Sequence, residues 1–438
     1  MIAANGPFRA RWDPTDLTRR LCFALGIARQ AVERLATNGY KNAEVPANNV
    51  RPEKVICETA ILLYAASAAS HHADVSAAIG TVAGLLIPHA RSTRMLLGVC
   101  LEPSLALDYA EAHICLSRLG YQDRQFDELL RQSRNAQAGF GRERVPHRVL
   151  EQRWIDGIWM ESISGGGERK PSPALLSVLN QPIDVLGGSR EDIYAFTHAL
   201  MYVRDFNIRP RRLPRARSVI LAEAEAVFAR CLDEDDYDLG GEVLMAWPLT
   251  GASWNEAAAF GFRVLARVEE KTGHLPAPST QQQRLDKLEG EARHDYWLAT
   301  AYHTIYVMGL LCAAALYPGR APPVRIPRQA APPRGAADMI LRFLDADGRS
   351  PHWRQLFDEI PPSERDALAR FLLNIALCRK VRRREFGAVH ELLRIGYASG
   401  LADIPAASQC AEMLERLAMF EHISGVSRAD LKQPPTPG

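Results

Sequence analysis

The 438-residue sequence lacks the motifs that identify the common enzyme chemistries. It contains no Walker loop, no G-x-G-x-x-G following a strand, no H-E-x-x-H and no G-x-S-x-G, so the usual nucleotide-binding, zincin and α/β-hydrolase sites have no support in it. Its eight cysteines include no C-x-x-C pair. Because they are widely spaced and mostly lie in apolar runs, we expect free buried thiols in a reducing compartment and neither disulfides nor a cysteine zinc site.

Charge excess and long apolar runs are also scarce. The formal net charge is +2, whereas proteins built around nucleic acid carry a clear excess of Lys and Arg. The arginine clusters at 204–217 and 379–384 are therefore interpreted as solvated faces. The longest uncharged apolar run, Thr304 to Tyr317, is shorter than the roughly 20 residues that span a bilayer, and the N-terminus has no signal-peptide core. The sequence predicts a cytoplasmic protein with neither a membrane nor nucleic acid as a partner.

The sequence does contain many helix-forming segments, which follow one another with short breaks. Alternating runs of Val, Ile and Thr, which indicate strands, are nearly absent. Start signals agree with helices: Asp13 before Pro14 suits an N-cap, and Ser253 with Glu256 matches a capping box. The expected helices cover residues 13–37, 52–70, 73–88, 103–119, 123–135, 146–160, 172–180, 189–206, 214–233, 238–247, 254–270, 284–317, 336–345, 363–398 and 405–424.

These segments predict an all-α fold class. With such short loops, consecutive helices should pair antiparallel, and the pairs should stack into a closed α/α toroid or, alternatively, an open α-solenoid. The proline-rich segment is the best domain boundary. We expect a main helical, toroid-like domain at 10–317, a proline-rich linker at 318–335, a C-terminal helical unit at 336–424 and a flexible tail at 425–438.

The helix expected at 189–206 has a polar face. At about 100° per residue, one side of it collects Tyr194, His198, Tyr202 and Asp205. The opposite side is aliphatic, and a helix lining an internal polar cavity has this pattern; an exposed face or a satisfied group of buried hydrogen bonds has it too. In a cavity, His198 could act as a general acid or base near neutral pH. Tyr202 and Asp205 would then assist catalysis, and Tyr194 would contact the substrate.

A partner for this face is expected in the helix at 284–317. Tyr296, Thr300, His303 and Tyr306 share one broad face of it. A histidine in so apolar a helix needs partners for its ring nitrogens, since an unsatisfied buried polar group costs about 1 to 3 kcal/mol. A neighbouring carbonyl or tyrosine would satisfy His303 without any function. In a site, His303 would be catalytic and Tyr306 would orient the substrate.

Carboxylates between these two helices complete the hypothetical site. Asp238 and Glu242 lie near an expected helix N-terminus, where the helix dipole stabilises acidic groups without any function. Alternatively, they join His198, Asp205 and His303 as ligands of a divalent metal, zinc or iron, which imidazole and carboxylate groups suit.

Three further candidates come from their local surroundings. Glu58 is the only charge between Val55 and Ser70, so it either takes part in proton transfer or has a buried ion-pair or backbone partner. His274 lies in a polar loop that could close over a site, although a lone loop histidine is usually solvated. Arg204 begins an arginine cluster that could hold a carboxylate or phosphate group of a substrate.

The segments YAFTHALMYVRDF, DYDLGG, TGHLP and AYHTIYVMGLL resemble a family of uncharacterised bacterial all-helical proteins with α/α-toroid architecture. The resemblance covers residues 190–317 and implies a toroid with a central funnel. Toroid enzymes carry their active sites in that funnel, which would hold His198 and His303. Such domains tend to accompany biosynthetic genes, but the resemblance implies no residue roles, since a fold alone does not fix function.

Two hypotheses about function follow. The first is a bacterial biosynthetic tailoring enzyme that acts on a small molecule or peptide in a cavity lined by His, Tyr and Asp, by acid–base or metal-assisted chemistry. The second is a non-catalytic helical-repeat protein that binds a peptide or protein partner. Convergence of the candidate residues within about 10 Å around a cavity favours the first, and their dispersal favours the second.

Overall fold

The computed structural model describes residues 14–37, 39–40, 51–135, 143–164, 177–327, 334–348 and 351–425. Almost all regular structure in these residues is helical, which confirms the predicted all-α class. The exception is one antiparallel ladder, in which β1 (Leu35–Ala36) pairs with β2 (Gly39–Tyr40). Strands of two residues are too short to form a layer of the core, so helix packing builds the fold.

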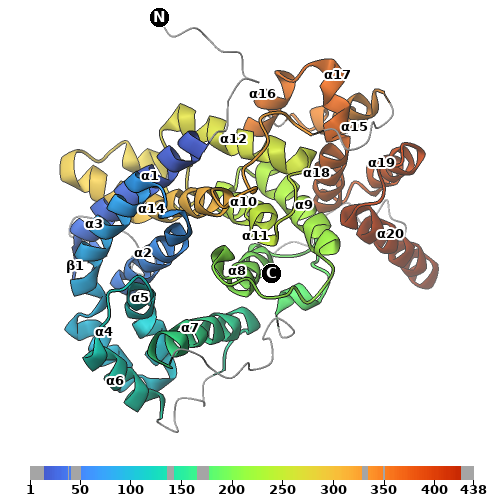
Figure 1. Cartoon of the computed structure of the whole chain (residues 1–438). Coiled ribbons are helices and arrows are strands. Elements are labelled where there is room, and N and C mark those ends of the chain that lie inside the picture. The colour runs from blue at the N-terminus through green and yellow to red at the C-terminus, as the bar shows by residue number, and fades with distance from the viewer. Residues whose placement is uncertain are drawn as a thin grey trace, which may run out of the picture.

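Six helices contact one another in cyclic order and form what we call the helical ring. In that order they are α2 (Pro52–Ala66), α5 (Ala106–Arg118), α7 (Pro146–Ser164), α8 (Arg190–Arg204), α10 (Tyr237–Leu244) and α14 (Gly290–Ala315), and α14 contacts α2 again. Figure 1 shows them arranged around a common centre. The choice between a complete α/α toroid and an open solenoid stays a prediction.

Local signals position the ring helices. The side chain of Ser189 accepts a hydrogen bond from the backbone N–H of Asp192, and the Asp192 carboxylate accepts one from Ser189, so a capping box begins α8. The carboxylate of Asp236 caps the first turn of α10. Gly241 lets α10 approach α14, because a Cβ at this position would lie only 2.6 Å from Val307 Cγ1.

Further helices surround the ring. Helix α1 packs along both α14 and α3. Helices α4 and α6 pack beside α5, and α9 packs on α10. These outer helices are α1 (Pro14–Glu33), α3 (Ala73–Ala90), α4 (Thr93–Leu101), α6 (Arg124–Arg134), α9 (Arg217–Asp233), α11 (Ala246–Thr250), α12 (Glu256–Thr272) and α13 (Gln282–Leu285). Short 3-10 helices link them at η1 (Ser67–Ala69), η2 (Pro103–Leu105), η5 (Val178–Asn180) and η6 (Asp205–Asn207).

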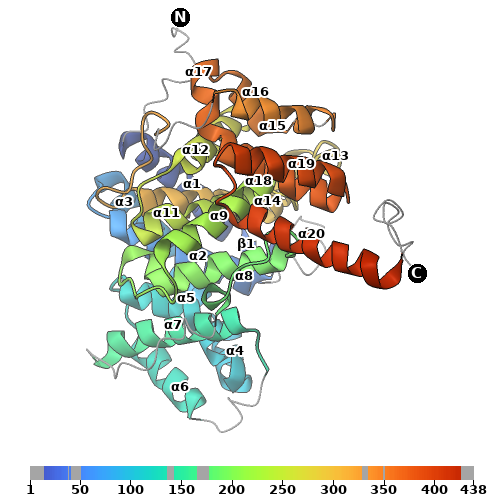
Figure 2. The same ribbon diagram turned by 90° about the vertical axis from the view of Figure 1, so that its right-hand side faces the viewer.

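The C-terminal helices pack on one another and join the rest of the protein through α9 and α12. They are α15 (Ala336–Asp345), α16 (His352–Asp358), α17 (Pro362–Arg365), η7 (Asp366–Leu368), α18 (Ala369–Arg382), α19 (Phe386–Ala398) and α20 (Pro405–Ser424). A buried ion pair between Arg379 and Asp233 ties α18 to α9. Figure 2 shows α20 projecting from the body of the molecule. The domain boundaries stay a prediction, and residues 10–13, 328–333 and 426–438 of the predicted units lie outside the described residues.

The structure corrects several local expectations. The helix expected at 189–206 ends at Arg204, because the three residues after it have φ angles of 44°, 48° and 67°. The helix expected at 363–398 is broken between α18 and α19, where Arg384 has a φ of 55°. Asn255 caps α12, where the sequence predicted a capping box from Ser253.

Other expected helices also have different bounds. The helix expected at 13–37 ends at Glu33 and is followed by strand β1. The helix expected at 284–317 is interrupted between α13 and α14, and α4 has no counterpart among the expected helices. The helix expected at 172–180 is described only from residue 177, where it is the 3-10 turn η5.

Two helices, α3 and α14, are long and apolar enough to cross a membrane by length and composition alone. The most apolar window of α14 is 89% buried inside the protein, and that of α3 is 33% buried. Core helices of soluble proteins pass the same test, so this is weak evidence for a membrane span. The cytoplasmic location and the expected absence of a membrane partner stay predictions.

Candidate active site

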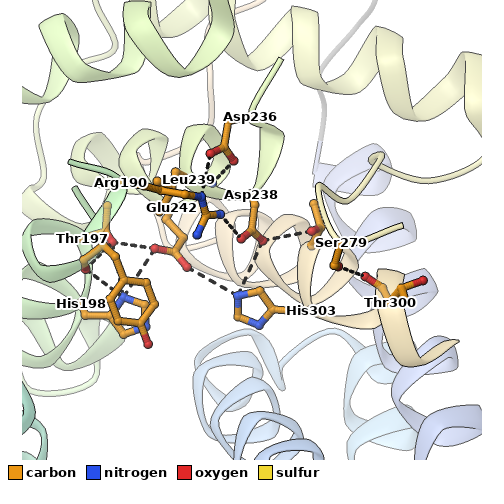
Figure 3. A network of polar contacts seen from close by, with 12 residues as sticks. Arg190, Thr197, His198, Asp236, Asp238, Leu239, Glu242, Ser279, Thr300 and His303 are labelled. Carbon is orange, nitrogen blue, oxygen red and sulfur yellow. Dashed lines mark hydrogen bonds and ion pairs between the residues drawn. The ribbon is translucent and has the colours of Figure 1, made fainter. Parts of the chain in front are cut away.

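His303 of α14 lies at the centre of a polar cluster inside the helical ring (Figure 3). Its Nδ1 is 3.1 Å from Glu58 Oε2 on α2, and its Nε2 is 3.6 Å from Asp238 Oδ1 and 3.8 Å from Glu242 Oε1 on α10. The side chain of His303 is 27% exposed. Three carboxylates therefore surround a histidine that solvent can still reach.

Glu242 connects His303 to a second histidine. Its Oε2 accepts a hydrogen bond of 2.6 Å from Thr197 Oγ1 and lies 3.5 Å from His198 Nδ1. Only 2% of the Glu242 side chain is exposed, and a carboxylate this buried needs partners of this kind. One carboxylate thus lies between the imidazoles of α8 and α14.

Asp238 closes the cluster on the side of the α8 N-terminus. Its Oδ1 accepts a hydrogen bond from Thr304 at 3.0 Å, and its Oδ2 accepts one from Arg190 at 2.8 Å. Arg190 also donates to Asp236. Both aspartates lie at the start of α10, where the helix dipole favours negative charge. The dipole therefore explains their position, and this explanation is compatible with a role in a site.

Mutual electrostatics fixes the charges in the cluster. Burial alone would lower the pKa of His303, but Glu58 and the other carboxylates outweigh burial and raise it well above its usual value. Burial would raise the pKa of the two glutamates, yet His303 lowers the pKa of Glu58 to about 2, and His198 holds the pKa of Glu242 far below its usual value. The cationic form of His303 and the anionic forms of the two glutamates therefore stabilise one another.

Three polar atoms in the cluster are buried without a hydrogen-bond partner among the described residues. They are Glu58 Oε2, His303 Nδ1 and the hydroxyl of Tyr302. The first two lie 3.1 Å apart and interact as an ion pair, and the Tyr302 hydroxyl also interacts with Glu58. Buried polar atoms without full hydrogen bonding at one place favour a position for a polar ligand group or water.

Two tyrosines of α8 connect this cluster to a charged group on α7. The ring of Tyr194 stacks on His198 with centroids 3.7 Å apart. The hydroxyl of Tyr202 donates to Glu151, whose other oxygen accepts from Arg148 at 2.7 Å. Two of the predicted residues, Tyr194 and Tyr202, thus contact His198 directly through their rings.

Glu111 of α5 faces the same group. Burial, and then the negative charge of Glu151, raise the pKa of Glu111 well above its usual value. Its Oε1 is buried without a hydrogen-bond partner in the described part of the chain. Glu111 thus differs from Glu58 and Glu242, whose pKa values are lowered.

Asp205 does not share the face of His198, because α8 ends before it. Its Oδ1 accepts hydrogen bonds from the Tyr64 hydroxyl at 2.9 Å and the Trp154 indole at 2.6 Å, and its Oδ2 accepts from Arg209 at 3.0 Å. Burial raises the pKa of Asp205 to about 6. These bonds hold the carboxylate in the turn that follows α8, with partners that differ from those of His198 and His303.

Three residues predicted to bind substrate have partners elsewhere. The hydroxyl of Tyr306 lies 2.9 Å from Thr59 Oγ1. Arg204 donates hydrogen bonds to two backbone carbonyls. His274 accepts a hydrogen bond of 3.2 Å from the indole of Trp297, in a separate hollow. Their substrate-binding roles stay predictions.

The geometry gives the zinc or iron hypothesis no support. No group of three or more His, Cys, Asp and Glu side chains in the described residues is arranged to hold a metal ion. Among the tentative ligands, Asp205 is bonded elsewhere, and the remaining four interact with one another as ion pairs. These four are His198, Asp238, Glu242 and His303.

Sequence reasoning missed the residues that complete the lining. Glu151 and Arg148 stand three apart on a helix, a spacing that is typical of surface ion pairs, so no signal singled them out. Glu111 did carry a weaker signal: its neighbours in the helix are mostly apolar, although Asp108 lies three residues before it. Thr197 and Arg190 belong to the cluster because they bond to Glu242 and Asp238 of α10. The sequence does not show such contacts between helices.

The fold and the cluster define a class of protein: an all-helical ring around a group of histidines and carboxyl groups. Residues 24–313 match a family described as a domain of unknown function, DUF6895. The match covers about two thirds of the chain, and the protein belongs to this family. The chain matches no curated protein and no solved structure.

Proposed function

We propose that the protein is an enzyme that moves protons on a small molecule or peptide bound inside the helical ring, as a tailoring step of bacterial biosynthesis. The observation that carries this proposal is the setting of His303. It is partly exposed, has carboxylates on both ring nitrogens and lies beside buried polar atoms that have no hydrogen-bond partner in the described chain. A histidine with a purely structural role would have its ring nitrogens hydrogen-bonded.

The two histidines would have complementary roles. His303, held as a cation by Glu58 and its neighbours, would donate a proton to the substrate. His198 would accept one, and the carboxylate of Glu242 would stabilise the imidazolium that forms. General acid–base catalysis of this kind contributes about 10² to 10⁴ in rate. No step in this scheme requires a metal.

The aromatic lining would orient the substrate. Tyr194 covers one face of His198, and Trp154 stacks on Tyr202 with centroids 4.9 Å apart. Flat side chains held by such stacking keep their positions, and a planar or apolar part of a substrate can lie against them.

The experiment compares wild type with His303→Gln and His198→Gln on a small-molecule extract of the native host, with mass spectrometry as the readout. His390→Gln is the control, because the side chain of His390 is 69% exposed and far from the cluster in the fold. We expect wild type and the control to convert the same compound, and the two cluster variants to convert it at least about 100-fold more slowly.

Three outcomes would overturn or change the proposal. Equal conversion by all variants would overturn it. Retention of a peptide or protein by wild type without any conversion would support the non-catalytic binding hypothesis. A stoichiometric metal in the purified protein, together with loss of conversion on chelation, would support metal-assisted chemistry.

A further inference from the structure

A hollow of about 640 Å³ lies beside the N-terminal half of α14, separate from the polar cluster. This volume is in the range of small-molecule sites. Ser279 donates a hydrogen bond to the Thr300 carbonyl (Figure 3), and Thr280 donates one to the Thr300 hydroxyl, so both hold the preceding loop against α14. Thr280 also lines the hollow, whose lining contains no residue of the His198–His303 cluster.

Three aromatic rings form one side of the hollow. Trp297 stacks with His294 at 5.9 Å between centroids and meets His274 edge-on at 5.3 Å. The Trp297 indole donates to His274 Nε2 at 3.2 Å, which fixes the imidazole as the tautomer with its proton on Nδ1. Burial lowers the pKa of His274, so this ring is neutral at pH 7. The three rings thus form an aromatic surface that carries no charge at His274.

The lining also includes apolar residues, the polar side chains of Thr272, Thr280 and Gln282, and the cation of Arg293. Leu285 and Ala277 are buried in the wall. Arg293 lines the hollow, and its guanidinium donates to the carbonyl of Leu285 at 3.0 Å, which fixes its position. The carboxylate of Asp286 is 3.9 Å away and 58% exposed. A guanidinium has five N–H donors, so Arg293 can still form a paired hydrogen bond with an anion.

We propose that this hollow binds a planar aromatic molecule that carries a carboxylate. Its ring would lie against Trp297 and the two imidazoles, and its carboxylate would accept hydrogen bonds from Arg293. This site is independent of the proposed acid–base function, because its lining contains none of the residues of the His198–His303 cluster.

The probe is 2-naphthoate, titrated into the full chain near pH 7.5 and followed by ligand-observed NMR. We expect saturable binding to one site. 2-Naphthamide, which has the ring without the charge, and cyclohexanecarboxylate, which has the charge without the aromatic ring, should each bind at least about fivefold more weakly. Equal affinities for all three compounds, or no saturable binding of 2-naphthoate at millimolar concentration, would overturn the proposal.

Variants locate the probe. Arg293→Gln should weaken 2-naphthoate by about five- to tenfold and leave 2-naphthamide unchanged. Arg267→Gln is the matched control, since Arg267 lines a second hollow, of about 380 Å³, between α12 and α16. Trp297→Leu should weaken both naphthyl compounds, and His294→Gln serves the same purpose if the tryptophan variant does not fold. An effect of Arg267→Gln or His303→Gln in place of Arg293→Gln would put the probe elsewhere and refute the site.

Discussion

Replacing Glu58 by glutamine tests the electrostatics of the polar cluster without any knowledge of a substrate. Glu58 lies 3.1 Å from His303 and 3.7 Å from Lys54. Glutamine keeps the shape of the side chain but removes its charge, so both cations lose an anionic partner. We expect Glu58→Gln to lower the free energy of unfolding, and the size of the loss to depend on pH.

The magnitude follows from the pKa of Glu58, which falls from 4.5 to about 2 in the folded protein. At about 1.4 kcal/mol for each pKa unit, this difference stabilises the folded state by about 3 kcal/mol. The stabilisation is present above the unfolded pKa of 4.5 and is lost as the pH falls through the folded value, so about 1 kcal/mol remains at pH 3.

His303 sets the upper limit of the pH range in which the ion pair stabilises the protein. Its pKa is raised in the folded protein from the ordinary value of 6.5, so its contribution is complete below pH 6.5 and is lost as the pH rises through the folded value. The ion pair therefore stabilises the protein most between about pH 4.5 and 6.5. The effect of Glu58→Gln should be largest in this range.

The assay is urea unfolding of wild type and Glu58→Gln at pH 3, 5.5 and 8.5, followed by tryptophan fluorescence and circular dichroism. Glu412→Gln is the control, since Glu412 is 66% exposed and lies 3.6 Å from Arg416; surface pairs of this kind contribute little. A difference between wild type and Glu58→Gln that is the same at pH 3 and pH 5.5, or that is no larger than the control's, would refute the ion-pair reasoning.

Three further predictions concern the helices around the cluster. Gly241→Ala should cost about 1 to 3 kcal/mol in urea unfolding, because the new methyl group would meet Val307, and Val307→Ala in the same chain should restore part of the loss. Asp205→Ala should lower the free energy of unfolding by about 3 kcal/mol, and Asp205→Asn by about 1 kcal/mol or less. Asparagine keeps an acceptor for the Trp154 indole and tolerates a φ of 44°. Equal losses for the two variants would contradict this prediction. Ellman's reagent should react rapidly with one thiol of the native protein, Cys100, the exposed one among the eight free cysteines, and more slowly with the partly buried Cys22. Rapid reaction of the six buried thiols would contradict this prediction.

The helical class and most helix positions could be predicted from the sequence, because helix periodicity and capping are local properties. The break between α18 and α19 could not, since Arg384 and its charged neighbours are good helix formers and do not predict the left-handed residue found there. The end of α8 was misplaced for a similar reason. Asp205 is drawn into the turn by Tyr64 and Trp154, which come from two other helices.

The candidate site was predictable to the extent that its residues stand out within a single helix. His303 and Glu58 are polar residues in apolar helices, and the structure brings them together with Glu242. Arg148 and Glu151 could not be identified, because their helix has charged residues all around it in the sequence and their burial depends on the facing helices. A polar lining made by several helices is a property of their contacts, which one sequence does not reveal.

The position of Glu242 determines whether the two histidines act separately or together. Its two oxygens face His198 at 3.5 Å and His303 at 3.8 Å, and its side chain is almost fully buried. Since one carboxylate stabilises positive charge on either ring, a positive charge on one imidazole disfavours a second charge on the other. A proton taken up by His198 could therefore move on to His303 once His303 has given up its own. If the ring is an active site, this shared carboxylate lets the acid and the base return to their starting charges after each turnover without a third titrating group.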